Sequence, residues 1–242
     1  MLLISDPGAF LASIAMPLVL GAFLLPVTRD QLVLAGRTDA GGEQVVPGMA
    51  VLFGFIGVQF VGMLFYREHA WGTWDRLRAS PASTLEIVAG KAAPLYLSQV
   101  LQVTVVLLAG VLLFDYRPNG SPFAIAALVV VFVAMLVAFG VMLVALCASM
   151  DVALMLGSLG GMVMAGLGGA LAPVSSLPGW TRPVARATPA YWAIDGLRAA
   201  SLDAARLFDI AGDLGMLLGF TVLFSLVAAL RLRMDDVKIG TT

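Results

Sequence analysis

The sequence has few of the side chains that most catalytic and metal sites require. It contains one cysteine and one histidine among 242 residues, and only 12% of its residues are charged. A single cysteine excludes an intrachain disulfide, and one Cys with one His cannot build a zinc site of the usual Cys/His type. Soluble domains carry about 25% charged residues. With 60% hydrophobic residues, the composition indicates an integral membrane protein.

Several functional classes also lack their usual residues here. The net charge of −1 argues against a nucleic-acid partner, which normally meets a basic patch. No GxxxxGK[ST] phosphate loop occurs, because Gly90-Lys91 is followed by Ala92 and lacks the hydroxyl that would hold magnesium. Mid-span acids, bases and histidines are absent, although Gln99 and Gln102 fall in the third span. This argues against a proton-driven antiporter, whose path needs ionisable groups, and against an intramembrane hydrolase.

Long uncharged runs dominate what the sequence does contain. A helix needs roughly 20 apolar residues to cross a bilayer, and six stretches meet this length. We predict one all-α transmembrane domain over residues 1–242, with spans at about 9–28, 46–66, 92–114, 122–148, 152–172 and 212–230. An even number of spans places both termini on the same side of the membrane.

A charged segment, residues 67–91, separates the second and third predicted spans and must lie in water at one membrane face. Trp71, Trp74 and Leu77 recur at spacings of three, which predicts one apolar face of a short amphipathic helix. Pro81 ends that helix, because proline disfavours the helical conformation of the residue before it. Ser83 or Thr84 can cap a second helix with Glu86 in its first turn.

The positive charges favour a cytoplasmic position for this segment. The side that holds residues 67–91 and the C-terminal tail has seven Lys and Arg residues, and the other side also has seven. Excluding residues 172–213, which form a long connection, leaves seven against three. Since short cytoplasmic loops carry the excess of Lys and Arg, we predict that both termini are cytoplasmic.

Residues 173–211 form a second distinctive segment, before the last span. Tyr191, Ile194 and Leu197 recur at spacings of three, while Asp195 and Arg198 share another face and could pair. Aromatic rings prefer the membrane interface, and the segment contains several, Trp180 among them. Two interpretations suit this segment. It is either a short helical segment that enters the membrane interface or a surface amphipathic helix without a transport role.

Small residues recur every four positions in the fifth span: Gly157, Gly161, Ala165 and Gly169. Such a ridge lets two helix backbones approach closely, either within this chain or between two subunits.

Larger, adaptable side chains in the second and fifth spans could line an apolar substrate path, although packing against lipid or core is the simpler interpretation. The residues proposed for this path are Phe53, Phe60, Met63, Met155 and Met162.

The charged segment resembles a known pattern. In order it contains Arg67-Glu68, Gly72-Thr73, Asp75, Leu77, Ser80-Pro81, Glu86-Ile87 and Gly90-Lys91, and this series is similar to the first cytoplasmic loop of ABC-2 type transporter permeases. A second matching region contains Leu177-Pro178-Gly179-Trp180, Arg182-Pro183 and Thr188-Pro189-Ala190-Tyr191, followed by Asp195 and Arg198. It resembles the short re-entrant helices that precede the last span of that family on the extracellular side.

The resemblance implies a permease subunit in a bacterial inner membrane. ATP and magnesium would bind to a separate ATPase chain, and this chain would hold no cofactor. A second permease subunit, identical or related, would pair through the fifth span. The resemblance is nearest to the drug-export branch of the family, and uncharged spans favour a hydrophobic or amphipathic cargo.

The resemblance also assigns the contact with the ATPase to one helix of the charged segment and its flanks. The residues expected to form this contact are Arg67, Glu68, Trp71, Gly72, Thr73, Trp74, Asp75, Arg76, Leu77, Arg78, Ser80, Pro81 and Glu86. An ion-coupled secondary transporter and a non-transporting accessory subunit remain as alternative functions.

Overall fold

The computed structural model describes residues 7–34, 41–63, 84–202 and 205–231. All the elements in these ranges are helices, and six candidate spans have the length and composition to cross a membrane. Five of the spans are built on α2 (Pro7–Leu34), α3 (Gly42–Gly57), α6 (Thr84–Leu113), α7 (Pro122–Leu146) and α12 (Ala211–Arg231). The other span joins α8 (Met150–Met155), the π-helical turn η1 (Leu156–Gly160) and α9 (Gly161–Leu167).

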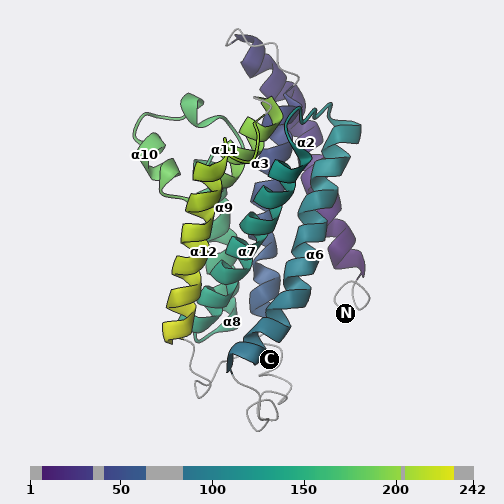
Figure 1. Ribbon diagram of the computed structural model, residues 1–242. Coiled ribbons are helices and arrows are strands. Elements are labelled where there is room, and N and C mark those ends of the chain that lie inside the picture. The colour runs from purple at the N-terminus through teal and green to yellow at the C-terminus, as the bar shows by residue number, and fades with distance from the viewer. Residues whose placement is uncertain (1–6, 35–40, 64–83, 203–204, 232–242) are drawn as a thin grey trace.

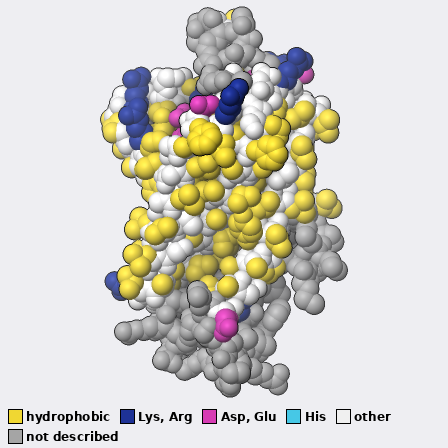
Figure 2. Space-filling view, in the orientation of Figure 1, with side chains coloured by type: hydrophobic (Ala, Val, Ile, Leu, Met, Phe, Trp, Pro, Cys, Tyr) yellow, Lys and Arg dark blue, Asp and Glu magenta, His cyan; other side chains and the backbone are white. Residues whose placement is uncertain are grey.

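The remaining short helices lie together at one end of the bundle (Figure 1). They are the 3₁₀ turn η2 (Val174–Ser176), α10 (Thr181–Arg186) and α11 (Pro189–Leu202). The start of α2 and the end of α12 lie at the opposite end, as an even number of spans requires. On the face shown in Figure 2, hydrophobic side chains cover the middle of the bundle and charged ones gather toward its ends. This distribution suits a protein that crosses a bilayer.

The second and fourth spans form the centre of the bundle. Within the described chain 78% of the α3 span and 67% of the α7 span are buried, whereas the other four spans are 11–33% buried. Phe55 of α3 meets Phe132 and Phe139 of α7 edge to face, with ring centroids 6.0 and 6.2 Å apart. The other spans therefore pack around a core built mainly on α3 and α7.

Several span boundaries differ from those predicted, and α2 runs to Leu34 rather than 28. The second span begins at Gly42, after Gly41 with φ of 84°, which brings Glu43 into the helix. The third begins at Thr84, so residues 84–91 of the predicted loop belong to a long helix. The fifth ends at Leu167 rather than 172.

The early end of the fifth span has a local cause in a glycine C-cap. Gly169 has φ of +100°, a left-handed conformation that favours glycine and stops a right-handed helix. The Ala170 N–H donates to the Ala165 carbonyl at 2.9 Å, and the Gly169 N–H to the Gly166 carbonyl at 3.2 Å. These are the two bonds of a Schellman motif. Gly169 therefore lies beyond the end of the helix, and the predicted small-residue ridge does not extend to it.

The rest of that ridge packs inside the chain. A Cβ added at Gly161 would lie 2.8 Å from the Phe55 Cβ, and one at Gly157 would lie 3.7 Å from a Val58 methyl group. Ala165 is completely buried. In the described chain Gly161 faces α3 and Gly157 lies near Leu143 of α7 and Val58, whereas a contact of these residues with a second subunit stays a prediction.

This packing predicts different tolerance at two adjacent glycines. Gly161→Leu should destabilise the protein by about 1–3 kcal/mol through overpacking against Phe55. Gly160→Leu, in the same span, should have little effect because no atom lies within 4 Å of its added Cβ. Thermal unfolding of the purified variants in detergent would test this. Equal losses of stability at both positions would contradict the intrachain packing.

Candidate functional site

Most of the segment predicted to contact an ATPase lies outside the described residues. Its members there are Arg67, Glu68, Trp71, Gly72, Thr73, Trp74, Asp75, Arg76, Leu77, Arg78, Ser80 and Pro81. Their helix and their contacts therefore stay predictions. Glu86 is described: it is exposed in the first turn of α6, where a carboxylate suits the positive end of the helix dipole.

At the other end of the bundle, α11 has the amphipathic character that the sequence predicts. Ile194 and Leu197 are each 2% exposed, Tyr191 is half-buried and Asp195 is exposed. The helix begins at Pro189, a favoured first residue because its φ is already helical. Its buried face packs against α3, α7, α9 and α12. It therefore closes one end of the core.

The aromatic residues around α10 and α11 occupy two environments. The Trp192 indole donates from Nε1 to the Arg186 carbonyl at 2.8 Å, and its ring meets Tyr191 edge to face at 5.3 Å. Trp180 is 68% exposed, a position available to the membrane interface. The predicted pairing of Asp195 with Arg198 stays a prediction.

A buried polar cluster lies between the start of α3 and α11. The Tyr116 hydroxyl is 2.6 Å from Ser201 Oγ, which also donates to the Leu197 carbonyl at 2.6 Å. Since Ser201 has one hydroxyl hydrogen, Tyr116 is the donor between the two. Burial raises the pKa of Tyr116 and the Glu43 carboxylate adds to this, while the bond to Ser201 opposes it. The phenol is therefore neutral at physiological pH.

Glu43 and Gln44 are the polar residues that the sequence analysis missed. They are 8% and 4% exposed. Gln44 donates from Nε2 to the Gly169 carbonyl at 3.0 Å, which ties the start of α3 to the end of the fifth span. Glu43 Oε2 and Gln44 Oε1 are buried without a hydrogen-bond partner among the described residues. The pair Gly41-Gly42, followed by an acidic residue in the first turn, indicates a helix that begins earlier than predicted. That start would have placed Glu43 and Gln44 within the helix of the second span.

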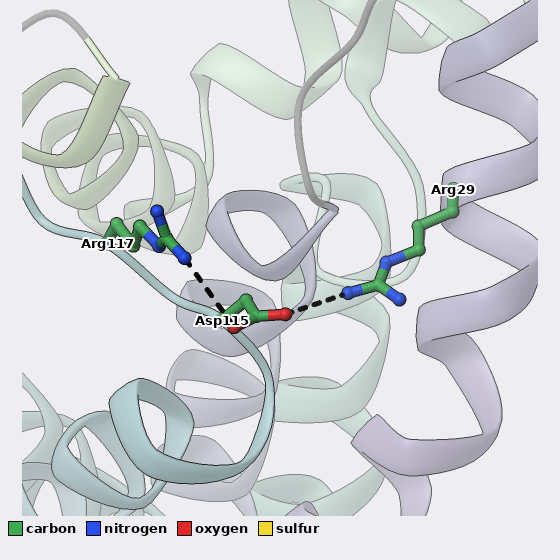
Figure 3. A network of polar contacts seen from close by, with 3 residues as sticks. All are labelled: Arg29, Asp115 and Arg117. Atoms are coloured by element: carbon green, nitrogen blue, oxygen red, sulfur yellow. Dashed lines mark hydrogen bonds and ion pairs between the residues drawn. The ribbon is translucent and has the colours of Figure 1, made fainter.

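An ion-pair network joins α2 to the connection between α6 and α7 (Figure 3). Asp115 Oδ2 lies 3.5 Å from an Arg29 nitrogen, and Oδ1 lies 4.0 Å from an Arg117 nitrogen. Asp115 has φ of 54°, a left-handed conformation that Asp tolerates better than most residues. All three side chains are partly exposed, so each pair contributes about 0–1 kcal/mol.

Two carboxamides connect the third span to its neighbours, and both lie in α6 as predicted. Gln99 donates from Nε2 to the Gly54 carbonyl of α3 at 3.0 Å. Gln102, 4% exposed, donates from Nε2 to the Ser13 carbonyl of α2 at 3.1 Å. These bonds fix how α2, α3 and α6 face one another in a region without water.

The residues suggested for a substrate path lie toward the outside of the helix bundle. Phe53 on α3 and Phe60, which follows α3 in the second span, are half-buried. Met63, Met155 and Met162 are 38%, 52% and 50% exposed. Side chains in these positions can face lipid or another protein chain, and their role in a path stays a prediction.

The six candidate spans and the polar contacts between them define a polytopic membrane protein. The ABC-2 type transporter family model matches residues 1–202, and the chain belongs to that family. This confirms the family that the charged segment and the region before the last span indicate.

Two curated relatives extend this comparison. The chain is 32% identical over 137 residues to the "Probable multidrug ABC transporter permease YbhR" of Escherichia coli strain K12, covering 56% of this chain and 37% of the relative. It is 27% identical over 176 residues to the "Linearmycin resistance permease protein LnrN" of Bacillus subtilis strain 168, covering 73% of this chain and 46% of the relative. The chain thus spans less than half the length of either. No solved structure gives a significant match.

The unpartnered Glu43 oxygen generates a stability prediction. Glu43→Gln should raise the melting temperature by about 2–4 °C, because a buried carboxylate oxygen without a hydrogen-bond donor destabilises the protein by more than the helix dipole stabilises it. Asp151→Asn is the matched control: it makes the same change in a first turn, at an exposed position, and should have little effect. A lower melting temperature for Glu43→Gln alone would show that the carboxylate is stabilised in place.

Proposed function

We propose that this chain is a permease subunit of an ATP-driven exporter. The observation that carries the proposal is the ABC-2 type transporter family match over residues 1–202, which includes the first five candidate spans. A separate chain would hydrolyse ATP, since this sequence lacks the phosphate loop needed for that chemistry. The permease would itself have no catalytic site or cofactor.

The amphipathic helix predicted around 71–79 would dock into the ATPase. Trp71, Trp74 and Leu77 would bury their apolar side chains, and the flanking charges would set the register of the contact. Closure of the ATPase on ATP would push this helix and shift the spans between two arrangements. The segment would lie in the cytoplasm together with both termini, in a bacterial inner membrane.

The cargo would be a hydrophobic or amphipathic molecule, such as a drug or lipid-like compound. One relative's name refers to multidrug transport and the other's to linearmycin resistance. The described spans carry few charges, and a path for a sugar or an ion would need polar groups. Residues 173–211 would form the re-entrant segment at the outer face, with Trp180 at the interface.

A second permease subunit, identical or related, would complete the transporter. Since Gly157 and Gly161 face neighbouring helices of the same chain, the contact with that subunit would use the opposite, outward face of the fifth span. Met155, Leu159 and Met162 on that face are each at least half exposed. They could border a path shared by two subunits.

Purification from native membranes tests the partner directly. We expect an ATPase to co-purify with the intact chain and to be lost when Trp71, Trp74 and Leu77 are all changed to alanine. Recovery of the chain without an ATPase, together with uptake that follows an ion gradient, would instead favour the secondary transporter.

A double variant tests coupling. Glu68→Ala with Trp74→Ala should reduce transport at least about tenfold, the effect of losing roughly 1.4 kcal/mol of coupling, while the protein still inserts in the membrane. Phe208→Ala with Asp209→Ala is the control: it also removes an aromatic and an acid, both exposed, between α11 and α12. Unchanged transport in the first variant would remove the coupling role assigned to residues 67–91.

A further inference from the structure

The second span is irregular near its middle. Helix α3 ends at Gly57, Val58 is a turn residue, and helical structure resumes over 59–63. The Val58 N–H donates to the Phe55 carbonyl at 3.1 Å, and the Val61 N–H to the Val58 carbonyl at 3.0 Å. Both bonds span three residues rather than the four of a regular α-helix.

At this turn the Val58 N–H bonds to the Phe55 carbonyl instead of the Gly54 carbonyl, which is its acceptor in a regular α-helix. Gln99 supplies another donor, with its Nε2 atom 3.0 Å from the Gly54 oxygen. An unsatisfied carbonyl in the bilayer core is costly, and side chains of neighbouring helices are the usual replacement. The irregular turn and the Gln99 hydrogen bond therefore depend on each other.

Gly57 makes room for this exchange. A Cβ added there would lie 2.5 and 2.6 Å from the two terminal atoms of the Gln99 carboxamide. Any side chain at position 57 would displace the amide from the Gly54 carbonyl. The hydrogen bond from the Gln99 carboxamide to Gly54 thus requires a residue without a Cβ at position 57.

The fifth span is irregular where it contacts the same turn. Its π-helical turn, Leu156–Gly160, lies against α3, with the Gly157 Cβ position 3.7 Å from Val58. Here too a side chain serves a backbone carbonyl: Ser158 Oγ donates to the Leu154 oxygen at 2.7 Å. Such π-helical turns are rare and often mark functional positions in helices.

We propose that Gln99 and Val58 are alternative donors to the Gly54 carbonyl, and that their exchange switches the second span between an irregular and a regular helix. In the arrangement described, Gln99 holds the carbonyl and Val58 bonds to Phe55. In the other, the Val58 N–H bonds to Gly54, Phe55 accepts from the Gln59 N–H, and the Gln99 amide is released. The Gly54 carbonyl keeps one donor in both.

The loss of a partner for the released amide biases this equilibrium toward the irregular form. Since the part of the span beyond Val58 leads into the segment proposed to contact an ATPase, the exchange would change the direction in which that segment leaves the membrane. This last link rests on the proposed function, whereas the exchange itself does not.

A double-variant cycle tests the exchange in the purified full chain. Gly57→Ala should lower the melting temperature by at least about 2 °C, because the new methyl group displaces the Gln99 amide. In a Gln99→Ala background the same change should leave the melting temperature unchanged or raise it, because alanine favours a regular helix. Gly62→Ala, whose added Cβ makes only an ordinary contact at 3.5 Å with Leu154, should give the same small shift in both backgrounds.

A distance measurement follows the shape of the span. With Cys147 replaced by alanine, spin labels at the exposed residues Met63 and Leu112 would report the position of the end of the second span against the third. We expect a shifted distance distribution in the Gly57→Ala/Gln99→Ala variant and none in Gly62→Ala. Additive stability effects with an unchanged distribution would overturn the proposal. Neither readout uses an ATPase or a cargo, so its failure leaves the proposed function standing.

Discussion

Inside a bilayer, each backbone carbonyl needs a donor from the protein itself, because no water is present to serve it. In this chain that requirement governs how the spans meet. Gln99 and Gln102 supply side-chain donors from α6 to carbonyls of α3 and α2, and Gln44 supplies one from α3 to the end of the fifth span. At two of these contacts a glycine lets the helices approach closely: Gly57 beside Gln99 and Gly48 beside Ala170.

The number of spans and the family follow from features that are local in sequence. Six uncharged runs predict six spans, and two ordered series of motif residues indicate the ABC-2 family, which the match over residues 1–202 confirms. Boundaries are harder to predict, because charged residues at a helix end do not stop the helix. Glu86 and Lys91 lie within α6, and Glu43 within α3.

The partners of a packing surface cannot be obtained from spacing alone. Gly157, Gly161 and Ala165 correctly indicate close helix packing, but the spacing is the same whether the second helix belongs to this chain or to another. The contact of Gly161 with Phe55 is one that the spacing could not identify. The buried cluster of Glu43, Tyr116 and Ser201 depends on contacts between residues more than 70 positions apart, so no local sequence pattern predicts it.

The bond from Gln44 to the Gly169 carbonyl and the contact of Gly48 with the Ala170 carbonyl lie at the same end of the second and fifth spans. Together they anchor two membrane helices at one end, so neither can slide along its axis without breaking a buried polar contact. A relative movement that keeps both contacts is a rotation about that anchored end. A small change in the angle between the two helices at that end would produce a larger displacement of their other ends, across the thickness of the membrane.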